Sequence, residues 1–411
     1  MDIAKQNPLN VCMFTNLFPP VVSGSSTQSA KLSYELIRSG HEPFVITARV
    51  DKSTPEYEEV DGVPVYRLPA IRLPRLPISL NFPWLSYTFT PGNLRKIETI
   101  FNRHRPEIIH LHNHMFDLSF SAVLMRRRYR IPLVITMHTM IRHTTRLYNL
   151  ILYPADRILL RYLVTNQAQL LICPDINIEK YVKEAFPKSS TVVLPYGITL
   201  PDKVDAAMVE QLRGKHHLDG KRVILSLGHV IELRDRRDLI AALPTIMKAI
   251  PDTVVVIVGN EATDRPRRLA HQLGVQDAVI FAGHVPHYKV PAYLALADLE
   301  IHLFYQDTPD NTSLGIASLE AMGAGNVVLV AANQDTYGKG ILKNGENVVL
   351  VDQGNPDKLA ETIVSFLNDK SRCRDIAERA KQTIREHFSW DSVCSGTIDV
   401  YEEVLRKHKS Q

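Results

Sequence analysis

The sequence is short of the residues that mark several classes of protein. Its 411 residues include only four cysteines, and no CxxC pair or Cys/His zinc spacing links them. This excludes a disulfide framework and gives no zinc motif, so we expect a reducing compartment. The charge is also nearly balanced, with 48 Lys and Arg against 44 Asp and Glu. That balance argues against a dedicated nucleic-acid-binding protein, and we expect no nucleic-acid partner.

Long apolar runs are missing as well. Two long stretches carry no charge, residues 6–30 and 76–94, but prolines interrupt both, so neither can form a continuous membrane-spanning helix. The first residues also lack the basic region and apolar run of a signal peptide. We therefore expect a cytoplasmic protein, either free or peripheral on the cytoplasmic face of a membrane.

Short apolar runs alternate with segments of helical period in two successive series, separated by the polar residues 198–220. The first predicts strands at 10–17, 43–48, 107–112, 132–137, 169–173 and 191–194, with helices at 27–39, 93–103 and 145–165. The second predicts strands at 222–227, 253–258, 277–282, 298–304, 326–331 and 347–351, with helices at 236–249, 262–273, 314–324 and 355–368. Apolar strands separated by helices are typical of parallel sheets covered on both faces. The expected fold is α/β, with two tandem Rossmann-like doubly wound domains facing a central cleft. We place the domains at 1–198 and 199–388, and expect a C-terminal helix, 389–411, to cross back to the first.

Ligands of such sheets bind beyond the carboxyl ends of the strands, so residues there are candidates. Ser23, Gly24 and Ser25 precede the first helix, and they either let a ligand approach the backbone or form an ordinary capped loop. His138 directly follows an apolar strand, and either bonds a substrate or is structural.

His110, His112 and His114 alternate along one strand end, so they share a face. A metal site there would lack a carboxylate or cysteine partner. We favour locally hydrogen-bonded histidines, and we expect no metal site.

The most informative segment is 311–332, NTSLGIASLEAMGAGNVVLVAA. Thr312 or Ser313 can cap a helix here, and the helix's first amides, those of Leu314, Gly315 and Ile316, can bind a diphosphate. Glu320 lies on this otherwise apolar helix. A carboxylate there needs a partner such as a ribose diol, unless it faces solvent.

This segment resembles the nucleotide-binding signature of the retaining GT-B glycosyltransferases of family 4 (glycosyl transferases group 1), written "EGFG…LEAMA.G.PVV". The resemblance covers nearly the whole chain. Its other matches, in order, are LFPPVVSGSSTQSAKLSYELIRSGHEPFVIT, EIIHLH, LVITMHTM, VVLPYGI, SLGHVIELRDRRDLIAAL, VVVIVGN, VIFAGHVP, ADLEIHLF and HFSWDSVCSGTIDVYEEVL. Each match is weak, but their order and spacing make the combination specific.

The resemblance implies roles for individual residues. Glu320 corresponds to the glutamate that holds the donor ribose, and Thr312 replaces the glutamate that contacts the donor sugar. His229 and Arg234 replace the family's phosphate-clamping Arg and Lys. His284 and Val285 belong to the loop that would face the base. Arg236 and Arg237 could compensate near the diphosphate, or be exposed helix arginines.

The resemblance also implies the chemistry. A UDP- or GDP-sugar donates its sugar with retention, while Arg234 and the amides of Leu314 to Ile316 stabilise the leaving diphosphate. His138 contacts the sugar, Thr312 takes the place of the donor-contacting acid, and no metal or other cofactor is needed. The acceptor is a hydroxyl of a lipid or lipid-linked glycan. Transfer to a soluble acceptor, or a nucleotide-sugar-binding subunit without catalysis, stays open because Thr312 and His229 depart from the family pattern.

The basic residues gather in the first half of the chain. Residues 1–200 hold 23 Lys and Arg against 15 Asp and Glu, and the remainder 25 against 29. Arg126, Arg127 and Arg128 end a predicted helix, and Trp84 belongs to a proline-broken aromatic stretch. Such residues suit an anionic membrane surface, unless the aromatics are core and the arginines solvated. The expected partners are a nucleotide sugar, a lipid or glycan acceptor and an anionic membrane, and we expect a monomer or homodimer.

Overall fold

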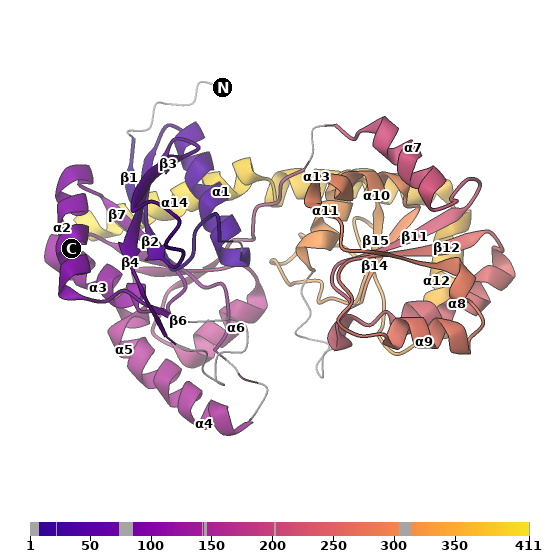
Figure 1. Cartoon of the computed structure of the whole chain (residues 1–411), viewed down its shortest axis with the longest axis horizontal. Coiled ribbons are helices and arrows are strands. Elements are labelled where there is room, and N and C mark those ends of the chain that lie inside the picture. Colours follow the sequence, from indigo (N-terminus) through magenta and orange to yellow (C-terminus); the bar gives the residue numbers. More distant parts are fainter. Residues whose placement is uncertain are drawn as a thin grey trace. The chain divides into compact units, whose positions relative to one another are not determined.

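The structure is a computed structural model of the chain, and it describes residues 8–21, 23–73, 85–141, 143, 146–200, 203–303 and 314–410. The chain divides into two compact units (Figure 1). The first comprises Met1–Gly197 with Trp390–Gln411, and the second comprises Ile198–Ser389. Each unit is an α/β sandwich around its own sheet, as the alternation of apolar runs and helical segments predicts.

The first unit contains an eight-stranded sheet in the order β10-β9-β8-β7-β1-β2-β4-β3. All neighbouring strands are parallel except β3 and β4, which form an antiparallel edge. The strands are β1 (Asn10–Thr15), β2 (Glu42–Arg49), β3 (Tyr57–Val60), β4 (Val63–Pro69), β7 (Ile108–His112), β8 (Leu133–Thr136), β9 (Leu170–Cys173) and β10 (Thr191–Val193). A separate ribbon joins β5 (Ile71–Leu73) and β6 (Leu85–Tyr87).

Helices cover both faces of this sheet. They are α1 (Gly24–Arg38), α2 (Pro91–His104), α3 (Leu118–Tyr129), α4 (Arg146–Pro154), α5 (Arg161–Leu163), α6 (Ile176–Ala185) and α14 (Trp390–Lys409), and a π-helical turn at Ala155–Leu160 joins α4 to α5. One core packs Phe14, Phe44 and Phe101 on one face of the sheet. A second core packs Leu36 and Tyr401 on the other face.

The last helix, α14, is an integral part of the first unit and lies beside α1 (Figure 1). Its first residue, Trp390, packs against Gly197, where an added Cβ would lie 2.5 Å from the indole ring. Near its end, the Tyr401 hydroxyl lies 2.6 Å from Nδ1 of His110 in the centre of the sheet. Residues far apart in sequence thus close one core.

The second unit contains a six-stranded parallel sheet in the order β13-β12-β11-β14-β15-β16. Its strands are β11 (Arg222–Leu227), β12 (Thr253–Val258), β13 (Val279–Gly283), β14 (Leu299–His302), β15 (Val327–Val330) and β16 (Val349–Leu350). Its helices are α7 (Ala206–Lys215), α8 (Arg237–Ala249), α9 (Arg265–Gln272), α10 (Val290–Leu296), α11 (Ile316–Ala324), α12 (Pro356–Asn368) and α13 (Lys370–His387). The strand order reverses between β11 and β14, and such a switch point is where ligands of open α/β sheets bind.

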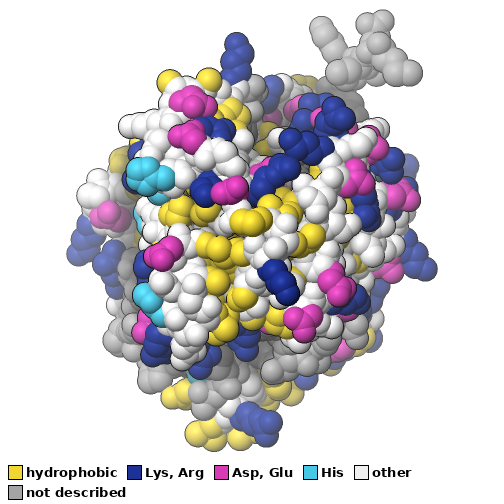
Figure 2. All heavy atoms as spheres, turned by 90° about the vertical axis from the view of Figure 1, so that its right-hand side faces the viewer, with side chains coloured by type: hydrophobic (Ala, Val, Ile, Leu, Met, Phe, Trp, Pro, Cys, Tyr) yellow, Lys and Arg dark blue, Asp and Glu magenta, His cyan; other side chains and the backbone are white. Residues whose placement is uncertain are grey.

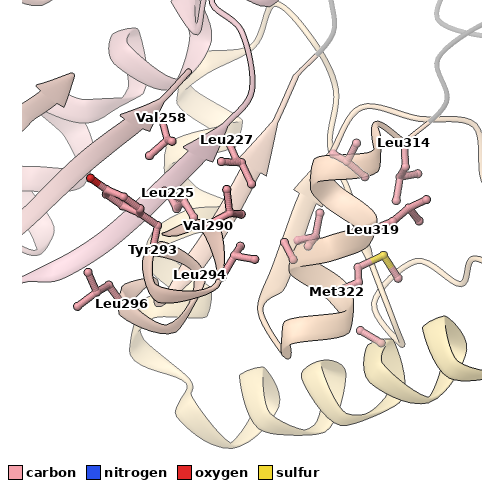
Figure 3. Close-up of a cluster of buried hydrophobic side chains, with 14 of the residues drawn as sticks. Leu225, Leu227, Val258, Val290, Tyr293, Leu294, Leu296, Leu314, Leu319 and Met322 are labelled. Atoms are coloured by element: carbon pink, nitrogen blue, oxygen red, sulfur yellow. The ribbon is translucent and has the colours of Figure 1, made fainter. Parts of the chain in front are cut away.

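A single apolar cluster fixes α11 beside this switch point (Figure 3). Leu314, Leu319 and Met322 come from α11 and the residues before it, and Val290 and Leu294 come from α10. Because these side chains are buried, the start of α11 is held in a defined place relative to β11 and β14.

Each of the twelve predicted apolar runs contains a strand, but the boundaries and several helices differ from expectation. The described residues of the polar stretch 198–220 form no strand, as predicted, but they do form α7. We did not anticipate α6, α10 or the hairpin of β3 and β4.

One face of the second unit carries interspersed charges of both signs with apolar side chains between them (Figure 2). That face lacks the single-sign field that nucleic-acid binding requires.

Candidate functional site

Two glycine turns follow β11 and β12 at the switch point. Gly228 and Gly259 have φ angles of 116° and 148°, which side chains rarely adopt. An added Cβ on Gly259 would lie only 2.2 Å from the carbonyl oxygen of Gly228, so the two backbones touch. An added Cβ on Gly228 would lie 3.6 Å from Cε1 of His302 and 4.0 Å from Nη1 of Arg234. The ring of His302 and the guanidinium of Arg234 therefore border one small space beside Gly228.

Arg234 supplies the cation of this space. It ends a short 3-10 turn, Glu232–Arg234, directly after β11. Burial lowers the pKa of its guanidinium. An arginine side chain nevertheless stays charged in proteins, and a partly desolvated cation interacts more strongly with an anion. This position suits the role that the sequence predicts for Arg234.

Arg236 corrects one of the sequence interpretations. It is not an exposed helix arginine, because only 5% of it is exposed and its φ of 60° places it just before α8. Its guanidinium donates to the carbonyls of Gly228 (2.7 Å) and His229 (3.0 Å), and to that of Arg234. Arg236 thus braces the loop that carries Arg234. Arg237 is exposed and forms an ion pair with Asp235 at 2.8 Å.

His229 lies in the same loop, and its side chain is exposed. Its carbonyl is held by Arg236, so the backbone of residue 229 is fixed while the imidazole faces solvent. His229 can therefore reach a ligand at the switch point.

The start of α11 differs from the sequence prediction. Gly315 is the N-cap, and no hydrogen bond from a described side chain caps the helix. The capping role expected of Thr312 or Ser313 stays a prediction. Both of those residues lie outside the described part of the chain. Leu314 is buried, and its carbonyl accepts a hydrogen bond from the Tyr337 hydroxyl at 2.9 Å. The first amides of a helix, here beginning at Ile316, have no intrahelical acceptor and favour an anion.

Glu320 and the loop after β13 are in direct contact. Nε2 of His287 lies 3.0 Å from Oε1 of Glu320, whose side chain is only 14% exposed. Glu320 is therefore partnered and shielded rather than solvent-facing. His284 is exposed and Val285 half-buried in the same loop. The structure thus brings together the predicted ribose-binding carboxylate and the loop predicted to face the base.

His138 is part of a buried chain of hydrogen bonds in the first unit. Its Nε2 lies 2.8 Å from Nδ1 of His112, and its Nδ1 lies 2.9 Å from the Tyr196 hydroxyl. Burial lowers the pKa of His138 to about 3, so the ring is neutral. Both ring nitrogens have protein partners, so a contact between His138 and a sugar requires exchange of one of these bonds.

The other strand-end histidines also have local partners. His110 contacts the hydroxyls of Tyr401 (2.6 Å) and Thr136 (2.7 Å), and His114 contacts Asp156 (2.8 Å). This agrees with the interpretation that we favoured. In the described ranges, no three His, Cys, Asp or Glu side chains are grouped so that they could hold a metal ion.

Ser23, Gly24 and Ser25 form the start of α1. The Ser23 hydroxyl accepts from the Ser26 amide at 3.1 Å, and the Ser26 hydroxyl accepts from the Ser23 amide at 2.7 Å. The capped-loop interpretation is therefore correct in detail. Gly24 is exposed, and an added Cβ there would meet nothing within 4 Å. A role of this loop toward an acceptor stays a prediction.

The three arginines that end α3 have different surroundings. Arg126 is half-buried, and burial lowers the pKa of its guanidinium. Arg127 donates to the Gln167 side chain at 3.4 Å, and Arg128 pairs with Glu98 at 3.3 Å. Trp84 lies outside the described residues.

Sequence reasoning missed an apolar surface on α4, the π-helical turn and α5. Residues 146–163 expose seven large apolar side chains, and α4 buries none of its residues. These seven are Leu147, Leu150, Ile151, Ile158, Leu159, Tyr162 and Leu163. The run RLYNLILYPADRILLRYL gave a signal, because its apolar residues are too many for one buried stripe. Across the part of the chain that the structure describes, no helix is both long and apolar enough to cross a membrane.

The sequence matches two families. Residues 22–200 match "Glycosyltransferase Family 4", and residues 208–383 match "Glycosyl transferases group 1". An uncharacterized glycosyltransferase of Methanocaldococcus jannaschii is 27% identical, over 96% of this chain and 98% of that protein. The alpha-monoglucosyldiacylglycerol synthase of Streptococcus pneumoniae is 24% identical, over 79% of this chain and 71% of that protein.

Solved structures share the fold. A glycosyltransferase from Rickettsia africae superposes with a TM-score of 0.71 at 15% identity, over 97% of this chain and 99% of that one. HepE of Anabaena in complex with UDP-glucose superposes with a TM-score of 0.65 at 17% identity, over 96% and 99%. Together with the two doubly wound sheets, these matches show that the chain belongs to the group 1, family 4 glycosyltransferases, a retaining family of nucleotide-sugar enzymes with the GT-B fold.

Proposed function

We propose that this glycosyltransferase moves a sugar from a UDP- or GDP-sugar to a lipid or lipid-linked hydroxyl acceptor at an anionic membrane surface. The second unit holds the donor and the first unit the acceptor. The observation that carries the membrane assignment is the exposed apolar and cationic face of residues 146–163.

The donor assignment rests on four groups around the switch point. Arg234 and the first amides of α11 meet the diphosphate, and the glycine turn at Gly228 lets the backbone approach it. Glu320 accepts from the ribose hydroxyls, and the loop with His284 and Val285 faces the base. As the sugar leaves, negative charge grows on the diphosphate. Arg234 and the helix amides are already oriented toward that charge, which lowers the barrier.

The acceptor assignment rests on the composition of the face formed by residues 146–163. Leu150 is 71% exposed and Leu147 68% exposed, and such contiguous apolar surface marks an interaction site. Arg146, Arg157 and Arg161 lie in the same segment. Its one acidic residue, Asp156, is buried and contacts His114 and Tyr181. Apolar side chains bordered by cations, with no exposed acid, suit an interface with anionic lipid. Figure 1 shows α4 at the periphery of the first unit.

The neutral histidines fit this assignment. His138 has both ring nitrogens bonded and a pKa lowered to about 3, so it is not a cation at neutral pH. We assign it to shaping the acceptor side and to sugar contact, rather than to proton abstraction. Thr312 keeps its proposed place near the donor sugar.

Co-sedimentation with vesicles tests the membrane assignment. The protein should bind phosphatidylglycerol vesicles at low salt, bind less at high salt, and bind phosphatidylcholine vesicles weakly. The double variant Leu150→Asp, Ile151→Asp should lose binding. The matched control is Leu124→Asp, because Leu124 is also an exposed leucine, on α3 of the same unit. Failure of the wild-type protein to bind anionic vesicles would overturn the assignment. A lipid-free dimer of the wild-type protein that the double variant dissociates would also overturn it, because the apolar face would then be a dimer interface.

Transfer assays test the chemistry. UDP and GDP sugars are supplied in turn with a membrane lipid extract or with soluble sugars, and the radiolabelled product is partitioned between solvent phases. We expect label in the lipid phase with one donor, and a large loss in Arg234→Ala. Label confined to soluble products would assign a soluble acceptor instead. Nucleotide binding without transfer or donor hydrolysis would identify a non-catalytic binding subunit.

A further inference from the structure

Two buried ionisable side chains lie side by side on β14 beneath the proposed diphosphate site. Glu300 and His302 are two residues apart on the strand, so they face the same side of the sheet. Glu300 is fully buried and His302 is 3% exposed. Oε1 of Glu300 lies 4.0 Å from Nδ1 of His302. The roles assigned above do not use either residue.

The hydrogen bonding of His302 fixes the direction in which it can act. Its Nδ1 lies 3.2 Å from the Leu227 carbonyl oxygen, which can only accept, so Nδ1 carries the proton of the neutral ring. Nε2 then presents a lone pair, and it has no hydrogen-bond partner among the described residues. An added Cβ on Gly315 would lie 3.3 Å from this Nε2. The bare nitrogen is therefore aimed at the start of α11.

The same ring edge faces the glycine turn after β11. Cε1 of His302 lies 3.6 Å from the position of an added Cβ on Gly228, and Arg234 Nη1 lies 4.0 Å from that position. Thus an unpartnered buried nitrogen, a cation and a helix N-terminus converge on one space. An anion there would complete the hydrogen bonding of His302 only if Nε2 carried a proton.

Without a bound anion, the surroundings favour a proton on the Glu300 carboxyl over a second proton on the His302 ring. Burial raises the pKa of Glu300 to about 8, against the opposing effects of the Leu227 backbone, Arg236 and Ser318. Burial lowers the pKa of His302 to about 3, and the charges of Arg234 and Arg236 lower it further. Among the described residues, the charged groups that act on the pair are these two arginines, in the loop after β11, and Ser318 faces it from α11.

We propose that Glu300 and His302 share one proton, which a bound diphosphate draws from the Glu300 carboxyl to Nε2 of His302. The O–H bond of Glu300 breaks and its proton passes to bulk solvent, while an N–H bond forms at Nε2 of His302 with a proton from bulk solvent, so the number of protons on the pair does not change. The resulting imidazolium donates to a phosphate oxygen, and the carboxylate behind it balances its charge. The inference rests on the proposed diphosphate site, and it makes His302 a donor contact and Glu300 a positioning residue.

The pair then sets a limit on donor binding at high pH. Above about pH 8 the empty site loses the shared proton. Binding must recover that proton, so the affinity should fall by up to about tenfold per pH unit. A buried carboxylate left without its proton would also repel the diphosphate. Between pH 7 and 8 the affinity should be nearly constant.

Calorimetric titration with UDP and with GDP, from pH 7 to 9.5, tests the inference. The terminal phosphate near pH 7 and the base near pH 9.5 also exchange protons, so this contribution of the nucleotide, which is the same for every variant, is subtracted from each measured uptake. Titrations in buffers of different ionisation enthalpy should show no proton uptake at pH 7 and an uptake approaching one proton at pH 9.5. Glu300→Gln should show neither the uptake nor the fall in affinity. His302→Gln, whose amide can donate a hydrogen bond without first taking up a proton, should keep binding at pH 7, and its affinity should fall less than that of wild type above about pH 8, because only the repulsion by the Glu300 carboxylate remains. Glu346→Gln, in an exposed turn of the same unit, should behave as wild type.

The outcomes separate this inference from the proposed function. Failure of both nucleotides to bind at any pH would reject the diphosphate site itself. Tight binding of one nucleotide without proton uptake at pH 9.5 would overturn the proton-sharing pair and leave the proposed function intact. Proton uptake that persists in both Glu300→Gln and His302→Gln would assign the proton to another group and also overturn it.

Discussion

The imidazole of His287 contacts the carboxylate of Glu320, with Nε2 and Oε1 3.0 Å apart. This contact ties the loop after β13 to α11, two segments that are 33 residues apart in sequence. Glu320 is held among apolar neighbours by α11, whereas His287 is exposed and free to rotate away. A ribose that binds Glu320 would therefore replace His287 or share the carboxylate with it.

The first prediction concerns the carboxylate of that contact. Glu320→Gln should weaken nucleotide diphosphate binding about tenfold, because a hydrogen bond to a charged group contributes about 1.5–3 kcal/mol. His287→Ala should change the affinity less, since it removes only a partner that the ribose replaces. Calorimetry with UDP and GDP measures both, with Glu346→Gln as the exposed control. A larger effect of His287→Ala than of Glu320→Gln would contradict the assignment.

The second prediction concerns the glycine turns. Gly259→Ala should destabilise the second unit by at least about 2 kcal/mol, because the new Cβ meets the Gly228 carbonyl and φ is unfavourable. Gly214→Ala, inside α7 with open space around it, should be neutral or slightly stabilising. Urea unfolding of the two variants gives the difference. Equal midpoints for Gly259→Ala and wild type would show that the two turns do not touch.

The third prediction concerns the closure of the first unit by α14. Tyr401→Phe removes the hydroxyl that lies 2.6 Å from His110 and leaves a buried nitrogen without that partner. The expected loss is about 1–3 kcal/mol of unfolding free energy. Tyr34→Phe, on the exposed side of α1, is the matched control and should cost almost nothing. If the two variants unfold alike, the contact contributes no stability.

The fourth prediction concerns acid. Burial lowers the pKa of both His110 and His138 to about 3, whereas an unfolded chain binds the proton near pH 6.5. Between these values the unfolded state holds more protons, so stability is full above about pH 6.5 and falls as the pH decreases. The slope is up to about 1.4 kcal/mol per pH unit for each histidine. Thermal unfolding from pH 7 to 5 measures it, and His138→Gln should show a shallower slope than wild type. Equal slopes in the two proteins would contradict the neutral buried ring.

The strands could be predicted because their signal is local. Runs such as residues 253–258 are apolar throughout, and a strand of a covered parallel sheet needs only that composition. Gly315 and Glu320 on the donor side could also be predicted from local sequence, because both belong to the continuous segment 311–332. The first residue of this helix was placed too early, because residue preferences alone do not fix a helix boundary.

The remaining errors have long-range causes. Arg236 is buried because three carbonyls of the folded loop and the Ser226 hydroxyl on β11 accept its hydrogen bonds, and nothing in the sequence RDRRD distinguishes it from Arg237. His110 meets Tyr401 across 291 residues of sequence. Sequence analysis did not identify Glu300 and His302 as a pair. The alternation of side chains along a strand gives the face of the sheet, but it does not reveal which residues of other elements lie against that face. The exposure of residues 146–163 likewise depends on tertiary packing, because it is set by whether another element of the fold packs against them.

The participation of α14 in the first unit has a consequence for synthesis on the ribosome. The second unit is one continuous stretch, Ile198–Ser389, so it can acquire its final structure while translation continues. The first unit leaves the ribosome earlier, yet Trp390 and Tyr401 complete its core only after nearly the whole chain has been made. Until then, the sheet face that α14 covers is exposed, and this nascent unit is the part of the chain that needs protection by chaperones.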